Sequence, residues 1–230
     1  MQDLFISYKN NDMLNNLSEN NEQQRNFWSG AFGNSYIGRN TSIKTSNQYH
    51  KEQTGITIDE IFEKYFSTIN RNSEILELGC NIGLKLSILQ RMGFKNLYGL
   101  ELNKKAIDIA RKNYPEITFF NSSIEDYKSK GKQYDLVYTS CVLIHINPTA
   151  LNSIINKIIN LTKEYIFGYE YYSDSLVEVV YRNHQSVMWK QNFPLLFTQN
   201  DSSIKILKQD IFKYKDENLA DIAYLLKKNS

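Results

Sequence analysis

The sequence is poor in cysteine and proline, with only 2 and 3 of these residues in a chain of 230. Cys80 and Cys141 lie far apart in the chain and lack the close spacing of zinc ligands. We interpret both as small, buried residues in a reducing compartment. The sequence therefore predicts neither a disulfide-stapled fold nor a metal site.

An excess of charge of one sign is also lacking, since 27 basic and 25 acidic residues leave a formal net charge of +2. Nucleic-acid-binding proteins usually present a clustered basic surface, so we expect no nucleic-acid partner. Residues 1–10 lack the basic start and apolar core of a secretory signal. No apolar run approaches the roughly 18 residues of a membrane span. We expect a soluble, cytoplasmic protein without a membrane partner. The sequence makes no prediction of its oligomeric state.

Aromatic residues are abundant, with 16 tyrosines and 12 phenylalanines. The tyrosines crowd into residues 165–181. A tyrosine ring is apolar in its body and forms hydrogen bonds at its tip, so such a cluster suits the wall of a binding pocket.

A glycine-punctuated turn follows the apolar run that begins at residue 75. Glu77 ends this run, and Gly79 and Gly83 follow it before a helical pattern starts. A strand, a glycine turn and a helix in succession are typical of a nucleotide-binding corner in an α/β sheet. The dinucleotide pattern Gly-x-Gly-x-x-Gly requires glycines where this chain has Asn81 and Leu84, which argues against an NAD-dependent enzyme.

Strand and helix patterns alternate through most of the chain, which predicts an α/β, Rossmann-like, doubly wound fold. The last two strands are separated by a polar loop instead of a helix. We predict strands at residues 74–78, 96–101, 118–121, 134–139, 164–170, 204–207 and 221–226, and helices at 57–69, 83–91, 104–113 and 148–161.

The N-terminal part has a different character. Residues 1–24 are polar and predict a loose lead-in or a short surface helix. Residues 27–40 combine three glycines with large aromatic side chains, which is typical of a loop, and we interpret them as a lid over a site. We predict an extension with a lid at 1–56 and the main domain at 57–230, with a substrate-side aromatic segment near 171–193.

The glycine turn resembles the acidic-x-Gly-x-Gly-x-Gly motif of class I S-adenosylmethionine-dependent methyltransferases. Glu77, Gly79 and Gly83 match the motif, and Asn81 replaces its middle glycine. Asparagine tolerates a positive φ, so the turn remains feasible. The resemblance implies a mostly parallel seven-stranded sheet with an antiparallel final pair, S-adenosylmethionine as cofactor and S-adenosylhomocysteine as product.

The same resemblance implies a role for each cofactor-site residue. Glu77 acts on the amino group of the methionyl tail through water, and the turn itself surrounds that tail. Glu101 ends the second strand and accepts both ribose hydroxyls. The implied cofactor-binding set is Glu77, Gly79, Cys80, Asn81, Gly83, Glu101, Leu102, Ser122, Ser123 and Ile124 (the last three at the adenine edge), with Thr139 and Ser140 beside the sulfonium.

The loop after the fourth predicted strand, residues 142–148, lacks the Asp/Asn-Pro-Pro-aromatic motif of amide and adenine N-methyltransferases. It contains His145, a candidate general base for a hydroxyl acceptor, because imidazole titrates near neutral pH. The alternative is a histidine that orients the loop. His184 is a second, weaker candidate base.

Segments 27–40, 142–148, 170–172 and 179–193 resemble the methylases associated with pseudaminic acid biosynthesis. The chain departs from them at Asn183, where that family has glycine, and at Gln191-Asn192, where it has Arg-Asp. The resemblance implies a nonulosonic acid sugar, or its nucleotide-linked form, as the acceptor in surface glycan biosynthesis.

The aromatic and basic residues of these segments suit an anionic, hydroxyl-rich acceptor. Arg39 and Arg182 are candidates to clamp a carboxylate, while the rings face the sugar. The alternative role, for about half of these rings, is packing around the fifth predicted strand. Methylation of another small metabolite or a protein, and a non-catalytic scaffold, remain open. The predicted substrate-binding set is Tyr36, Arg39, Asn40, Tyr171, Tyr172, Tyr181, Arg182 and Trp189.

Overall fold

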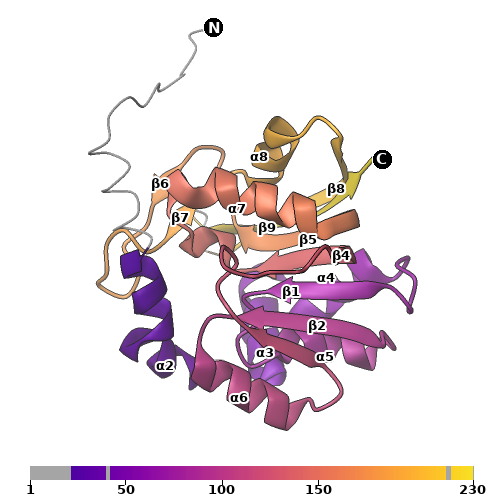
Figure 1. Cartoon of the computed structure of the whole chain (residues 1–230). Coiled ribbons are helices and arrows are strands. Elements are labelled where there is room, and N and C mark those ends of the chain that lie inside the picture. Colours follow the sequence, from indigo (N-terminus) through magenta and orange to yellow (C-terminus); the bar gives the residue numbers. More distant parts are fainter. Residues whose placement is uncertain (1–21, 40–41, 216–218, 230) are drawn as a thin grey trace, which may run out of the picture.

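The computed structural model describes residues 22–39, 42–215 and 219–229. Most of the predicted lead-in lies outside these residues, as does Asn40. The described chain forms a central sheet with helices on both faces (Figure 1).

Seven strands form the sheet in the order β3-β2-β1-β4-β5-β9-β8. The first five strands in this order are parallel, whereas β9 pairs antiparallel to both β5 and β8. The predicted fold class is thereby confirmed. The strands are β1 (Glu74–Leu78), β2 (Asn96–Glu101), β3 (Thr118–Asn121), β4 (Tyr134–Ser140), β5 (Thr162–Tyr171), β8 (Ile204–Lys213) and β9 (Ala220–Lys228).

Burial along the strands follows their position in the sheet. The central strands β1 and β4 are buried over nearly their whole length, because helices cover both faces of a parallel sheet. The edge strand β8 is mostly exposed, and it interleaves lysines with apolar residues.

Two apolar clusters hold the layers together. On one face, α4 (Ile58–Phe66), α5 (Leu84–Arg91) and α6 (Lys104–Asn113) pack on the sheet. On the other face, α7 (Pro148–Leu161) and α8 (Phe193–Asn200) do so. Ile43 of a further helix, α3 (Ile43–Thr54), packs against the first cluster.

Side-chain caps fix where the helices near the sheet's carboxyl edge begin. The Asn103 side chain accepts from the backbone N–H groups of Lys105 and Ala106 at the start of α6. Asn147 caps α7 in the same way, with Pro148 in the first helical position. Both caps lie at the edge where the parallel strands end.

Most predicted elements agree with the structure. The bounds of β2, β3, α6 and α7 are those predicted, whereas β8 and β9 extend beyond the predicted segments. The prediction missed α3, α8 and the short helix η1 (Leu143–His145). It also missed a separate pair of strands, β6 (Val177–Glu178) and β7 (Trp189–Lys190).

The prediction of a loop over residues 27–40 was wrong. Residues 22–29 are helical and α2 spans Ala31–Ile37. The glycines serve close packing, because a Cβ at Gly33 would lie 1.6 Å from the Trp28 carbonyl oxygen. Figure 1 places α2 beside the carboxyl ends of β1 and β2. The predicted domain boundary at residue 56 stays a prediction.

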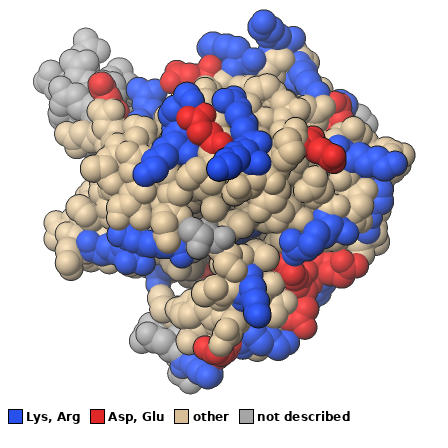
Figure 2. All heavy atoms as spheres, turned by 90° about the horizontal axis from the view of Figure 1, so that it is seen from below, with Lys and Arg blue, Asp and Glu red and all other residues tan. Residues whose placement is uncertain are grey.

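Basic and acidic side chains are intermixed on the face seen in Figure 2. Ion pairs such as Lys104–Asp108 at 2.5 Å and Arg91–Asp59 at 3.0 Å join the two signs. Within the residues that the structure describes, no helix is long and apolar enough to cross a membrane.

Candidate active site

A cavity opens at the carboxyl ends of β1, β2 and β4. The sheet order reverses between β1 and β4, which is where open α/β sheets bind their ligands. The cavity encloses about 990 Å³ of space between atoms, its open mouth included. The loops after β1, β2, β3 and β4 line it, and residues 24–37 close it from the other side.

The glycine turn forms the cavity wall next to β1. Gly79, Asn81 and Gly83 all have positive φ, at 71°, 49° and 81°. The backbone N–H groups of Gly79 and Cys80 donate to the Leu100 carbonyl at 2.7 and 3.0 Å, which ties the turn to β2. Gly79 and Asn81 line the cavity, whereas the predicted residues Cys80 and Gly83 do not.

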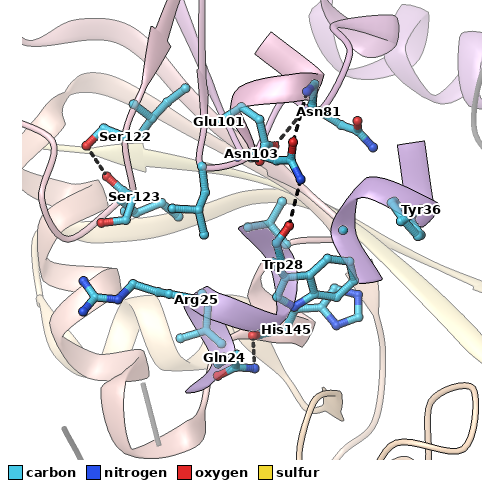
Figure 3. A pocket seen from close by; sticks show the side chains of 18 of the residues that line it. Gln24, Arg25, Trp28, Tyr36, Asn81, Glu101, Asn103, Ser122, Ser123 and His145 are labelled. Atoms are coloured by element: carbon cyan, nitrogen blue, oxygen red, sulfur yellow. Dashed lines mark hydrogen bonds between the residues drawn. The ribbon is translucent and has the colours of Figure 1, made fainter. Parts of the chain in front are cut away.

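Glu101, at the end of β2, is held by two backbone donors. Its Oε2 accepts from the N–H of Asn81 at 2.9 Å, and its Oε1 accepts from the N–H of Asn103 at 2.8 Å (Figure 3). Burial raises the pKa of Glu101, and these N–H groups oppose the shift. The carboxylate lines the cavity with lone pairs left on both oxygens. It can accept two hydroxyl groups side by side.

Glu77 lies behind the cavity wall. Its carboxylate is buried and accepts from the Tyr138 hydroxyl at 2.8 Å. Burial raises the pKa of Glu77 to about 7. Because Glu77 does not line the cavity, its predicted action on a ligand amino group requires an intermediary such as water.

The loop after β3 forms the opposite end of the cavity. Ser122, Ser123 and Ile124 line it, as does Leu102 after β2, and the predicted contact of residues 122–124 with adenine stays a prediction. Ser122 donates to the Ser123 carbonyl at 3.0 Å, which shapes this loop. The predicted Thr139 and Ser140 are buried in β4 and do not line the cavity.

His145 lines the cavity from η1. Its Nδ1 is 2.9 Å from the Val187 carbonyl oxygen, an acceptor, so Nδ1 carries the proton. Nε2 is therefore a lone-pair acceptor, with no hydrogen-bond partner among the described residues. Burial lowers the pKa of His145 to about 4, so the ring is neutral at physiological pH. The ring centroids of His145 and Trp28 are 4.3 Å apart (Figure 3).

Glu170 holds the loop that carries His145. The carboxylate is fully buried and accepts from the N–H groups of Val142 at 3.0 Å and Ile144 at 3.4 Å. Burial raises the pKa of Glu170 to about 7, against the effect of these donors. The position of His145 thus depends on a carboxylate at the end of β5.

Some of the predicted substrate residues gather on one side of the cavity. Tyr36 lines it, and the ring of Tyr181 is 5.3 Å from that of His145. The phenol of Tyr181 raises the pKa of Arg182, and Tyr36 and Tyr171 add to this shift. We call Tyr36, Tyr171, Tyr181 and Arg182, which interact electrostatically, the tyrosine–arginine group. Of these four residues, only Tyr36 lines the cavity.

Other predicted residues lie elsewhere. Arg39 lies over the ring of Phe32, and exposed His184 lies 5.2 Å from the same ring, between centroids. Tyr172 donates to Asp174, and Trp189 is buried in β7. These four residues do not line the cavity, and their predicted roles stay predictions.

The sequence reasoning missed several lining residues. Gln24 ends the polar lead-in and Arg25 follows it, and no sequence pattern distinguished either residue. Asn103 was detectable as a helix cap, but not as a cavity residue. Cys141, interpreted as a simple buried residue, lines the cavity with a positive φ of 56°.

The residues present fit S-adenosylmethionine. Glu101 offers paired acceptors for a ribose diol, and Ile124 offers an apolar surface for a base. The Asn81 side-chain oxygen is buried without a hydrogen-bond partner among the described residues, which suits an ammonium group. Among those residues, no cluster of His, Cys, Asp or Glu that could hold a metal was found.

The architecture is the Rossmann-like methyltransferase fold. Residues 75–165 match the model of a family described as a methyltransferase domain. This part contains the glycine turn, Glu101 and His145. An uncharacterized methyltransferase from Synechocystis is 30% identical over 95 residues, which are 41% of this chain and 44% of that protein. The match thus spans less than half the length of that relative.

Solved structures extend the similarity to nearly the whole chain. Magnesium protoporphyrin IX methyltransferase from Synechocystis, with bound S-adenosylmethionine, has a TM-score of 0.65 at 14% identity, covering 91% of this chain and 97% of that one. The 1,6-didemethyltoxoflavin-N1-methyltransferase of Burkholderia thailandensis has a TM-score of 0.66 at 10% identity, covering 97% and 93%. At these identities the likeness shows the fold.

The buried Glu170 should make stability depend on pH. The pKa of Glu170 is about 7 in the folded protein against 4.5 for the unperturbed group. The contribution of this shift to the stability of the fold is therefore complete below pH 4.5 and is lost as pH rises through 7. Relative to Glu170→Gln, the unmodified protein should lose about 2 kcal/mol of unfolding free energy between pH 5 and pH 8. Urea unfolding at several pH values measures this difference.

Glu116→Gln is the matched control, because Glu116 is exposed and has no hydrogen bond among the described residues. Its pH curve should parallel that of the unmodified protein. A parallel curve for Glu170→Gln as well would show that Glu170 is ionised throughout.

Proposed function

We propose that this protein transfers a methyl group from S-adenosylmethionine to a small, hydroxyl-rich, acidic acceptor. The observation that carries the proposal is the Glu101 carboxylate, which the backbone N–H groups of Asn81 in the glycine turn and of Asn103 hold at the cavity edge. The match of residues 75–165 to a methyltransferase domain supports the same activity.

The cofactor supplies an electrophilic methyl group on a sulfonium. In our proposal, Glu101 binds the ribose diol and residues 122–124 contact the adenine. Gly79 and Asn81 surround the methionyl tail. Methyl transfer is a displacement that needs little covalent help, so positioning and exclusion of water supply most of the rate.

A small-molecule acceptor fits the enclosure of the cavity. Residues 24–37 cover the side that a macromolecule would have to approach. The acceptor would lie against the tyrosine–arginine group, whose phenols offer hydrogen bonds and whose guanidinium attracts an anion. These features favour a carboxylated sugar, and we specify a nonulosonic acid of the pseudaminic type or its nucleotide-linked form, in glycan biosynthesis.

His145 is our candidate for the general base. Its Nε2 is the acceptor atom of a fixed tautomer, and the ring contacts those of Trp28 and Tyr181. The acceptor hydroxyl would give its proton to Nε2 as its oxygen forms the bond to the methyl carbon and the carbon–sulfur bond breaks. A neutral ring is ready to take this proton without first losing one.

A different small-molecule acceptor is the alternative enzyme function, because the fold does not fix the substrate. A non-catalytic, cofactor-binding scaffold is the alternative from another class, and the Asn81 substitution in the glycine motif is the feature that favours it. Cofactor binding without turnover on any acceptor of a panel would support the scaffold.

Cofactor binding is the first test. The unmodified protein should bind S-adenosylhomocysteine in calorimetry, and Glu101→Gln should weaken binding about 10- to 100-fold because an amide replaces one charged acceptor. Glu116→Gln is the control for lost surface charge. Absence of binding to the unmodified protein would overturn the proposed function, and unchanged affinity in Glu101→Gln would remove Glu101 from the site.

Replacement of His145 tests the base. His145→Ala should lower kcat about 100-fold or more while the affinity for S-adenosylhomocysteine stays within twofold. Because the pKa of His145 is about 4, kcat of the unmodified enzyme should not fall between pH 8 and pH 6 through its protonation. A larger loss of kcat in His184→Gln than in His145→Ala would reverse our choice between the two histidines.

Arg182 tests the acceptor class. With pseudaminic acid and its nucleotide-linked form as acceptors, Arg182→Ala should raise the acceptor KM about tenfold and leave cofactor affinity unchanged. Arg182→Lys keeps the charge and should recover part of the loss. An equal fall in cofactor affinity would place Arg182 in the cofactor site. No turnover with either sugar would reject this acceptor class while leaving cofactor binding intact.

A further inference from the structure

The segment 22–39, which we call the lid, is joined to the rest of the protein by polar contacts and by contacts between half-buried rings, such as Trp28 with His145 and Phe32 with Tyr181. Its apolar anchor is small, with Ile37 packed against Ile82 and Ala106 in a cluster separate from the two main ones. Elements with few buried apolar contacts open at lower free energy than the core. The lid can therefore open without global unfolding.

Gln24 latches one end of the lid to the loop that carries His145. Its side-chain Nε2 donates to the His145 carbonyl, and its Oε1 accepts from the N–H of Asn147 at 2.9 Å (Figure 3). The Gln24 amide thus donates one hydrogen bond to the loop backbone and accepts one from it, as a residue of a neighbouring β-strand does. Arg25 adds an ion pair to Asp126 at 3.1 Å.

Asn103 holds the middle of the lid and also belongs to the ribose site. Its Nδ2 donates to the Trp28 carbonyl at 3.2 Å and to Asn34 Oδ1 at 3.1 Å. Its backbone N–H donates to Glu101 Oε1, and its Oδ1 caps α6. Figure 3 shows this continuous path from Asn81 through Glu101 and Asn103 to Trp28.

We infer that Asn103 is a positioning residue that couples ribose recognition by Glu101 to closure of the lid. This inference rests on the proposed function, because the ligand on Glu101 is the cofactor. A ligand on the carboxylate fixes Glu101, which fixes the Asn103 backbone and keeps Nδ2 directed at the lid. Closure in turn completes the cavity with Trp28 and places that ring on His145.

The coupling has a consequence for the order of events. Lid residues line the cavity, among them Trp28 and Tyr36, so opening of the lid widens the passage by which the cofactor enters and its product leaves. Cofactor binding therefore favours the closed form, and the lid shields the bound cofactor from water.

Hydrogen exchange of the backbone amides in residues 22–37 measures lid opening directly. With S-adenosylhomocysteine at 100 times its Kd, exchange in the unmodified protein should slow at least about tenfold, because the ligand binds the closed form. Asn103→Ser keeps a capping oxygen but is too short to reach Trp28. In this variant, the factor by which the ligand slows lid exchange should be about fivefold smaller than in the unmodified protein.

The Gln24→Glu variant separates the attachment of the lid to the His145 loop from the coupling through Asn103. It removes the donor to the His145 carbonyl and should speed lid exchange about 3- to 10-fold, with the slowing by ligand retained. Gln23→Glu is its matched control, because Gln23 is exposed and has no hydrogen bond among the described residues. This control should exchange as the unmodified protein does.

The outcomes distinguish the inference from the proposed function. If S-adenosylhomocysteine binds in calorimetry but lid exchange is unchanged, the coupling is wrong and the proposed function stands. If the slowing by ligand is as large in Asn103→Ser as in the unmodified protein, Asn103 is only a helix cap. If the unmodified protein binds no ligand, both the proposed function and the coupling are overturned.

Discussion

The hydrogen bonds between the Glu101 carboxylate and the N–H groups of Asn81 and Asn103 are the interaction on which the site depends. One carboxylate joins the turn after β1 to the loop after β2, so it fixes the distance between two walls of the cavity. The donors offset part of the cost of burying a charge, and the cavity-facing lone pairs stay available to a ligand. A structural constraint and a binding site therefore use the same two oxygens.

Patterns confined to one segment were predictable from the sequence. The bounds of β2, β3, α6 and α7 agree with the structure because hydrophobic periodicity and helix-start signals, such as Pro148 in the first turn of α7, are local. The resemblance to class I methyltransferases placed Glu101 and residues 122–124 at a cofactor site, and all four line the cavity at the edge where the parallel strands end.

Features that depend on contacts between distant segments were not predictable. Gln24 meets the loop at His145 across 121 residues, and its own neighbourhood is polar and without pattern. Residues 27–37 resemble a loop in composition, yet they are mostly helical because Gly33 allows close approach to Trp28 and Asn103. In both cases a contact with another part of the chain determines the structure, and the local sequence does not reveal that contact.

The place of β9 in the sheet has a consequence for synthesis of the protein. This strand, residues 220–228, inserts between β5 and β8 and pairs with both. Until it has left the ribosome, β5 has one unpaired edge and β8 has no neighbour in the sheet. The sheet is therefore completed only after this strand has been synthesised, and until then the nascent chain exposes a strand edge that is prone to pair with other chains.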